Sequence, residues 1–125
     1  MHITASAISL NVPDPAASAR FLIEHLGFEE KMSADGFVSL DRGDAGLNVI
    51  YLRTGLASFK PKSVAGSAGE GLLVVFVVDD IDAEYTRLRA EGVPIVTPIE
   101  TEEWGERYFQ MSDPNGIIIQ LVQWV

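Results

Sequence analysis

The chain repeats one pattern, and this repetition limits the folds open to it. At an offset of 66 residues, identical residues align, among them Val12 with Val78, Asp14 with Asp80 and Leu22 with Leu88. At an offset of 70, residues 46–52 (GLNVIYL) align with residues 116–122 (GIIIQLV). A chain of 125 residues has the length of a single domain. We therefore expect one domain over residues 1–125 that is built from two similar halves.

Each half is expected to begin with a strand and a helix. Residues 7–12 alternate as a half-buried strand does, and the helix after them has Asp14 as N-cap, Pro15 at its first position and Gly27 as C-cap. In the second half, the apolar run 72–80 predicts a strand, and a helix follows it over residues 81–92. Three shorter strands then follow in each half: 28–33, 36–43 and 47–52, and 93–98, 107–114 and 116–124.

These elements give a βαβββ unit over residues 1–52 and another over 72–125, an α+β architecture. One such unit is too small to bury both faces of its sheet, so we expect the two sheets to form one curved, half-open barrel with the helices outside. Its concave face would leave a pocket. Residues 53–71 are rich in Gly, Ser, Ala and Lys. They are either a plain linker or a partly ordered flap that brings Lys60 and Lys62 near an opening.

Composition excludes several kinds of partner and site. Eighteen acidic and nine basic side chains give a net charge of -9, which disfavours nucleic acid and anionic membranes. With no cysteine, the chain has no disulfide, zinc–thiolate site or thiol nucleophile. No signal peptide or apolar run of membrane-spanning length is evident, so a cytoplasmic location is expected.

Three segments resemble the vicinal-oxygen-chelate superfamily, which includes glyoxalase I, extradiol dioxygenases and bleomycin-resistance proteins. They are residues 10–28 (LNVPDPAASARFLIEHLGF), 74–95 (VVFVVDDIDAEYTRLRAEGVPI) and 104–121 (WGERYFQMSDPNGIIIQL). The resemblance implies the two-unit fold described above. It also implies a divalent metal on the concave face, with His, Glu or Gln ligands from the first and last strands of each half.

The four ligand positions of that superfamily fall on Ala7, Ile50, Leu73 and Gln120. Three of these side chains have no donor atom, whereas zinc takes about four ligands and Mg²⁺ about six. His2 lies at a terminus and His25 in the last turn of the first helix, so neither is expected to be a ligand. We therefore expect no metal site and no cofactor.

Strand alternation extends these positions to the rest of the concave face. The residues expected there are mainly apolar, with a few amides and one hydroxyl: Ala7, Ser9, Asn11, Asn48, Ile50, Leu52, Leu73, Val75, Val77, Ile118, Gln120 and Val122. This composition is typical of a small-molecule pocket. The set has no carboxylate, histidine, lysine or cysteine, so we expect no catalytic acid–base pair. Gln120 is expected to orient a ligand, or else to be a core amide.

Residues 100–110 (ETEEWGERYFQ) are expected along the rim of this pocket. Trp104 offers a face for stacking, and the glutamates around it would favour a cation. Alternatively, Trp104 closes an edge of the core and the loop is simply solvated. Only one of Arg107 and Tyr108 can point inward, and the pattern does not say which, so both stay candidates.

The resulting hypothesis is a metal-independent binding protein similar to the bleomycin-resistance branch. It would sequester a hydrophobic or cationic small molecule, such as a drug or natural product, as in antibiotic resistance, and it would be a homodimer. One alternative is an enzyme, either a lyase or isomerase of the glyoxalase type or a dioxygenase, with ligands supplied across a dimer interface. Another is an interaction module with a vestigial pocket. Whether the halves pair within one chain or swap between two is left open.

Overall fold

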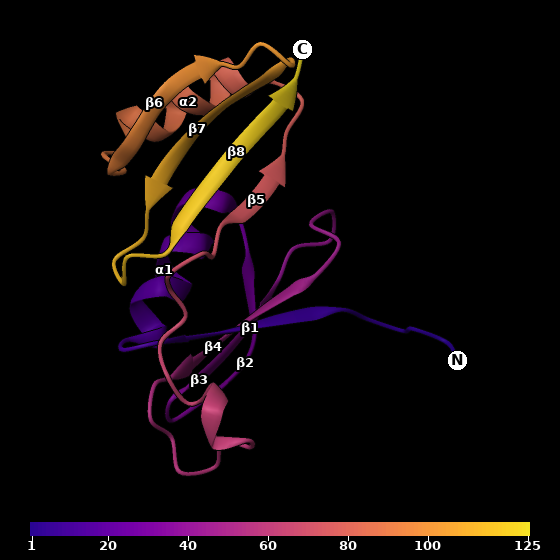
Figure 1. Ribbon diagram of the computed structural model, residues 1–125, viewed down its shortest axis with the longest axis vertical. Helices are drawn as coiled ribbons and strands as arrows, with labels where there is room; N and C mark the ends of the chain where they lie inside the picture. Colours follow the sequence, from indigo (N-terminus) through magenta and orange to yellow (C-terminus); the bar gives the residue numbers. More distant parts are fainter. The chain divides into compact units, whose positions relative to one another are not determined.

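The computed structural model describes residues 1–125, which divide into two compact units, residues 1–68 and 69–125. Each unit has one four-stranded sheet with one helix packed against it (Figure 1). The predicted α+β class and the repeated βαβββ order are confirmed. The pairing of the two sheets in a half-open barrel, and within a single domain, stays a prediction.

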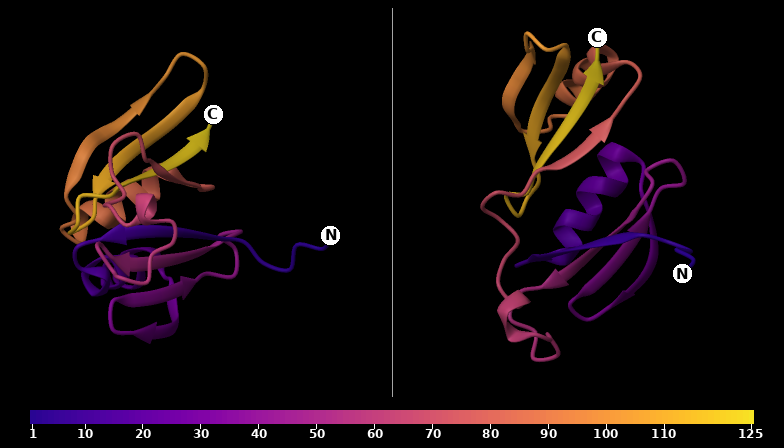
Figure 2. Two further views of the ribbon diagram at one scale, coloured as in Figure 1. Left: turned by 60° about the horizontal axis from the view of Figure 1, so that its bottom comes forward. Right: turned by 45° about the vertical axis from the view of Figure 1, so that its right-hand side comes forward.

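The first unit contains β1 (Ala7–Val12), α1 (Pro15–Leu26), β2 (Glu29–Ala34), β3 (Phe37–Asp41) and β4 (Asn48–Arg53). Its strands lie in the order β1-β4-β3-β2, with β1 parallel to β4 and the other pairs antiparallel. The helix covers one face of this sheet (Figure 2). On β3 and β4 every second residue is buried on that face, including Leu40 and Tyr51, and Leu10 of β1 is buried there too. This alternation is the one that the sequence pattern predicts.

The second unit repeats the arrangement with β5 (Val74–Val77), α2 (Ile81–Ala90), β6 (Ile95–Thr101), β7 (Glu106–Ser112) and β8 (Ile118–Trp124). Its strand order is β5-β8-β7-β6, again with one parallel pair, β5 with β8. Leu88 on α2 is fully buried, as its counterpart Leu22 is on α1. The Tyr85 ring packs against Phe109 of β7, with 4.9 Å between ring centroids.

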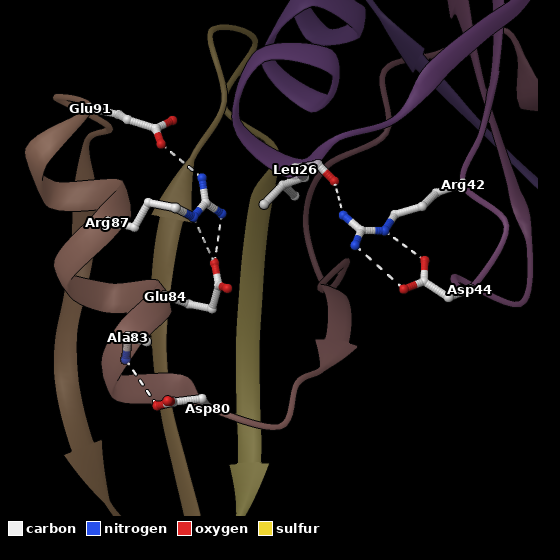
Figure 3. Close-up of polar contacts among 8 residues, drawn as sticks. All are labelled: Leu26, Arg42, Asp44, Asp80, Ala83, Glu84, Arg87 and Glu91. Atoms are coloured by element: carbon white, nitrogen blue, oxygen red, sulfur yellow. Dashed lines mark hydrogen bonds and ion pairs between the residues drawn. The ribbon is translucent and has the colours of Figure 1, made fainter.

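Local sequence explains where both helices begin. The carboxylates of Asp14 and Asp80 accept bonds from the backbone N–H of Ala17 (3.2 Å) and Ala83 (3.1 Å), so the aligned aspartates are equivalent N-caps. The Asp80 cap is drawn in Figure 3. Neither helix is long and apolar enough to cross a membrane.

Side chains also stabilise both helices farther along. Helix α1 ends at Gly27, whose φ of 71° is left-handed, and the Arg42 guanidinium donates to the Leu26 carbonyl there (Figure 3). On α2, Arg87 pairs with Glu84 at 2.6 Å and with Glu91 at 2.8 Å (Figure 3). These pairs at i,i+3 and i,i+4 are of the kind that supports a solvated helix face.

The segment after β4 has local structure of its own, as a partly ordered flap would have, whereas Lys60 and Lys62 are not among the residues that line the pocket beside it. A short 3₁₀ helix, η1 (Lys62–Val64), lies within it, and the Gly55 N–H donates to the Ala65 carbonyl at 2.9 Å. Residues 55–68 are called the strap below. The strap belongs to the first unit, because the unit boundary follows Ala68.

Candidate functional site

Each sheet has one face against its helix and one face turned away, called the open face below. In the first unit, strand register puts the predicted pocket residues opposite one another on the open face: Ala7 with Asn48, Ser9 with Ile50 and Asn11 with Leu52. In the second unit it does the same for Val75 with Gln120 and Val77 with Val122. Ile118 lies on the same open face, opposite Ser112, and Leu73 precedes β5. The strand residues that alternation groups together thus share one face of each sheet, and their role in binding stays a prediction.

A directed chain of hydrogen bonds crosses the open face of the second sheet. Thr97 Oγ1 donates to Gln110 Oε1 at 2.7 Å, and Gln110 Nε2 donates to Gln120 Oε1 at 2.8 Å. Gln120 Nε2 then donates to Glu106 Oε1 at 3.0 Å. Gln120 is only 6% exposed, so a buried amide of this kind needs these partners. It lies inside, as predicted, but both ends of its amide are used within the sheet.

Glu106 is the last acceptor in this chain of hydrogen bonds. Its second oxygen, Oε2, accepts a bond from the Trp104 indole N–H at 3.0 Å. The carboxylate is therefore held by two donors from different segments, and its orientation is fixed. The expectation of an inner face without any carboxylate is wrong. Glu106 lies opposite Trp124 on β8, and the alternation from Gln110 through Tyr108 to Glu106 is the signal that would have found it.

The structure decides between Arg107 and Tyr108. The Arg107 guanidinium donates to Asp82 on α2 at 2.7 Å and to Thr101 Oγ1 at 2.8 Å, so this side chain lies on the helix face of the sheet. Arg107 is therefore removed from the predicted set on the open face. Its hydrogen bonds lower the pKa of the Asp82 carboxyl, because the positive charge stabilises the carboxylate.

Tyr108 lies on the open face with two carboxylates at its hydroxyl. Its oxygen is 2.7 Å from Glu100 Oε1 and 2.8 Å from Glu102 Oε1. These hydrogen bonds, to Glu100 first, raise the pKa of the phenol, because a phenolate would face two negative charges. Tyr108 therefore acts at this site as a hydrogen-bond donor rather than as a base.

The open face of the second sheet also carries exposed apolar side chains. Trp104 lies in the turn between β6 and β7 and is 67% exposed, so it does not close an edge of the core. Val75 and Val77 of β5 are exposed as well, and Val77 keeps 65% of its surface. The open face of the second sheet thus combines an oriented negative charge, an indole and aliphatic surface.

The residues at the superfamily's metal positions do not fit a metal. Ala7, Ile50 and Leu73 have no donor atom, and the Gln120 amide is bonded to Gln110 and Glu106. No group of three His, Asp or Glu side chains is found that could hold an ion. We therefore derive no chemical step through a metal.

The first unit has a pocket of its own, between β1 and the strap. It has a volume of about 490 Å³, and Ser9 and Asn11 of β1 line it together with strap residues that include Phe59 and Ser67. Two of the predicted pocket residues therefore do line a pocket. The part of its wall that the strap supplies was not predicted residue by residue.

Comparisons with known proteins agree with this fold. The model of the Glyoxalase/Bleomycin resistance protein/Dioxygenase superfamily matches residues 2–121. The uncharacterized protein Mb0911c of Mycobacterium bovis is 34% identical over 59 residues, which are 47% of this chain and 37% of that protein. The chain thus spans about a third of the length of the mycobacterial relatives that it matches. The uncharacterized protein YraH of Bacillus subtilis is 27% identical over 122 residues, 91% of this chain and 93% of YraH.

Solved structures are similar over almost the whole chain. A glyoxalase/bleomycin resistance protein/dioxygenase from Nocardioides has a TM-score of 0.79 at 23% identity, over 100% of this chain and 85% of that one. TioX from Micromonospora sp. ML1 has a TM-score of 0.76 at 24% identity, over 98% and 100%. The lactoylglutathione lyase of Agrobacterium tumefaciens has a TM-score of 0.77 at 18% identity, over 96% and 92%. At these identities the likeness shows the fold alone.

Proposed function

Because the chain belongs to the Glyoxalase/Bleomycin resistance protein/Dioxygenase superfamily, we propose that it is a metal-independent binding protein for hydrophobic cations, with drug or natural-product sequestration as its role. The binding surface is the open face of the second sheet. One observation carries this proposal: Gln120 and the Trp104 indole hold the Glu106 carboxylate in place on a sheet face that also carries exposed apolar side chains.

The arrangement suits a ligand that has a positive charge and an apolar body. An oriented carboxylate attracts a cation without the entropy cost of ordering its own side chain, and the adjacent indole face adds a cation–π contact. Val75 and Val77 supply aliphatic surface for the body of the ligand. The net charge of -9 increases the rate at which cations arrive.

Gln120 acts in this proposal as a positioning residue rather than as a ligand contact. Its amide transmits the orientation of Gln110 to Glu106, because each amide donates to the next acceptor in one direction. Glu106 is the group that contacts the cation. The Glu106 carboxylate, at the end of the series of hydrogen bonds, therefore recognises the cation, and the buried Gln120 amide fixes the orientation of that carboxylate.

Two ions of the same shape and opposite charge test the proposal. Tetraphenylphosphonium is titrated into the protein by calorimetry, with tetraphenylborate as the matched anion. We expect saturable binding of the cation alone, and a loss of affinity of about 10-fold in Glu106→Gln, since that change removes a close charge–charge contact but keeps an oxygen for Gln120. Gln120→Leu should weaken binding as well, because the carboxylate loses one of its two donors.

Glu103→Gln is the control, because it removes one negative charge from an exposed position in the turn that precedes Glu106. Equal losses in Glu103→Gln and Glu106→Gln would show that net charge alone attracts the cation, and would refute the proposed site. Binding of tetraphenylborate at the same affinity would refute it too. Recovery of bound natural products in altered form would favour the enzyme alternative. The expected homodimer is tested separately by sedimentation.

A further inference from the structure

We propose that the space between β1 and the strap in the first unit is a second binding site, for an uncharged aromatic molecule that carries hydrogen-bond donors. This site is separate from the surface proposed above, because all of its lining residues belong to residues 1–68. The site is a pocket whose wall includes the buried side chain of Asn11, and it requires no charge on the ligand.

Asn11 of β1 holds the strap in place. Its Nδ2 group donates to the carbonyls of Val64 and Gly66, the second at 3.0 Å, and its backbone carbonyl accepts from the Ala68 N–H at 2.8 Å. Three hydrogen bonds thus join one residue of the sheet to the end of the strap. The pocket is a defined part of the first unit, formed by specific contacts with the sheet.

Asn11 also indicates which kind of hydrogen-bonding group a ligand should carry. Both hydrogens of Asn11 Nδ2 are used by the strap, so only the side-chain oxygen is left for a ligand. Asn11 is 9% exposed, and no buried side-chain oxygen or nitrogen lacks a partner. The Asn11 oxygen, for which no donor is found in the protein, is therefore not fully buried, and Asn11 is one of the residues that line the pocket. This oxygen is an acceptor, so a molecule that occupies the pocket should donate to it.

The remaining walls define the class of ligand. Three serine hydroxyls line the pocket, those of Ser9, Ser63 and Ser67, and Phe59 offers an aromatic face. No charged side chain lines it, and the Lys62 ammonium is bonded to the Ala57 carbonyl at 2.9 Å. A charged ligand would find no countercharge among these side chains. The volume of about 490 Å³ lies within the usual range of small-molecule pockets.

Three compounds that share a phenol ring and differ in charge test whether the pocket selects an uncharged ligand. 4-Hydroxybenzamide is neutral, 4-hydroxybenzoate is an anion and 4-hydroxybenzylamine is a cation. Each is titrated into the full chain while its backbone amide resonances are followed by NMR. We expect saturable shifts at Ser9, Ser67 and Ala68 with the benzamide, at a dissociation constant on the order of 1 mM, as befits a fragment of this size. The benzoate and the benzylamine should not shift these resonances.

Two variants locate the site. Phe59→Ala removes the aromatic wall, and Ser9→Phe fills the pocket from β1 without altering any bond to the strap. Each should weaken benzamide binding at least about 10-fold. Protection of the Ala68 amide from hydrogen exchange reports whether the strap stays in place in these variants. Glu106→Gln should bind the benzamide as the unmodified chain does, which separates this site from the cation surface.

The proposal is overturned if the benzamide gives no saturable shifts in the strap, or if Ser9→Phe binds it unchanged. Equal binding of the benzoate and the benzamide would also overturn it, since the pocket would then not select for an uncharged molecule. Failure of the tetraphenylphosphonium experiment would leave this result unaffected, because the two sites lie in different units.

Discussion

At the scale of single residues, Tyr108 gives the clearest pH dependence. Its hydroxyl has one proton and two carboxylate neighbours, Glu100 and Glu102, so it can donate to only one of them at a time. Both negative charges oppose ionisation, and the pKa of the folded phenol is raised above the value of about 10 that an unfolded tyrosine has. A raised pKa stabilises the fold at pH values below about 10, and this contribution is lost as the pH rises further.

We therefore predict that stability falls with alkaline pH more steeply in the unmodified chain than in Tyr108→Phe. The measurement is urea unfolding at several pH values on either side of about 10. A difference ultraviolet titration of the two proteins isolates the Tyr108 phenol from the other two of the chain's three tyrosines. A phenol that titrates at or below its ordinary pKa in that difference would contradict the contacts described above.

Residue-level prediction worked where alternation within one strand decided it. Gln120 and its neighbours on β8 were placed on the correct face because their spacing alone fixes it. Glu106 was missed because the sequence does not say whether Arg107 or Tyr108 points toward the helix. Glu106 shares a face with Tyr108, so its own direction was not known either. Register shifts in β6, on both sides of Thr97, further hide the pattern.

At the scale of elements, the aligned aspartates allow a matched test of the two helices. Asp14→Ala and Asp80→Ala each remove a carboxylate that accepts from the first turn, at 3.2 Å and 3.1 Å. We expect each to lower the free energy of unfolding by about 1 kcal/mol, and Asn at either position to restore most of it. Urea unfolding measures the loss, and hydrogen exchange shows which helix is affected.

Asp79→Ala is the control for these cap variants. Asp79 is adjacent to the second cap, but it is the backbone carbonyl of Asp79 that accepts a bond, from Gln123 Nε2 at 2.8 Å. Its carboxylate has no part in that bond, so its removal should change stability little. A loss equal to that of Asp80→Ala would mean that negative charge near the helix start matters, rather than the cap itself.

Most elements were predictable because their signals are local. Caps, helical spacing and alternation identified both helices and all eight strands. The boundaries of β5 were predicted too wide, since the prediction covered residues 72–80, of which 72–78 are apolar, but only Val74–Val77 are in register with β8. The strap was left undecided because its order depends on Asn11, which lies more than 50 residues away from Val64 and Gly66 in the sequence.

At the scale of the whole molecule, duplication gave two units with the same architecture and different open faces. The position that is Ile50 in the first unit is Gln120 in the second. In the second unit, Gln110 and Glu106 supply the hydrogen-bond partners that a buried amide needs. The first unit instead has a strap tied to its β1 strand. One fold thus presents two different surfaces, which is why superfamily membership leaves the ligand open.

Metal binding separates the proposed binding protein from the metal-dependent enzyme alternative. Three of its four ligand positions, Ala7, Ile50 and Leu73, offer no donor atom, and the fourth is bonded within the sheet. We expect that dialysis against a chelator leaves the affinity for tetraphenylphosphonium unchanged. We also expect that added Mn²⁺, Ni²⁺ or Zn²⁺ is not retained through gel filtration, as measured by elemental analysis. Even one tightly held ion would require three or more ligands that this chain would have to bring together by rearranging. Stoichiometric retention would therefore overturn the binding assignment and favour a metal-dependent lyase or isomerase.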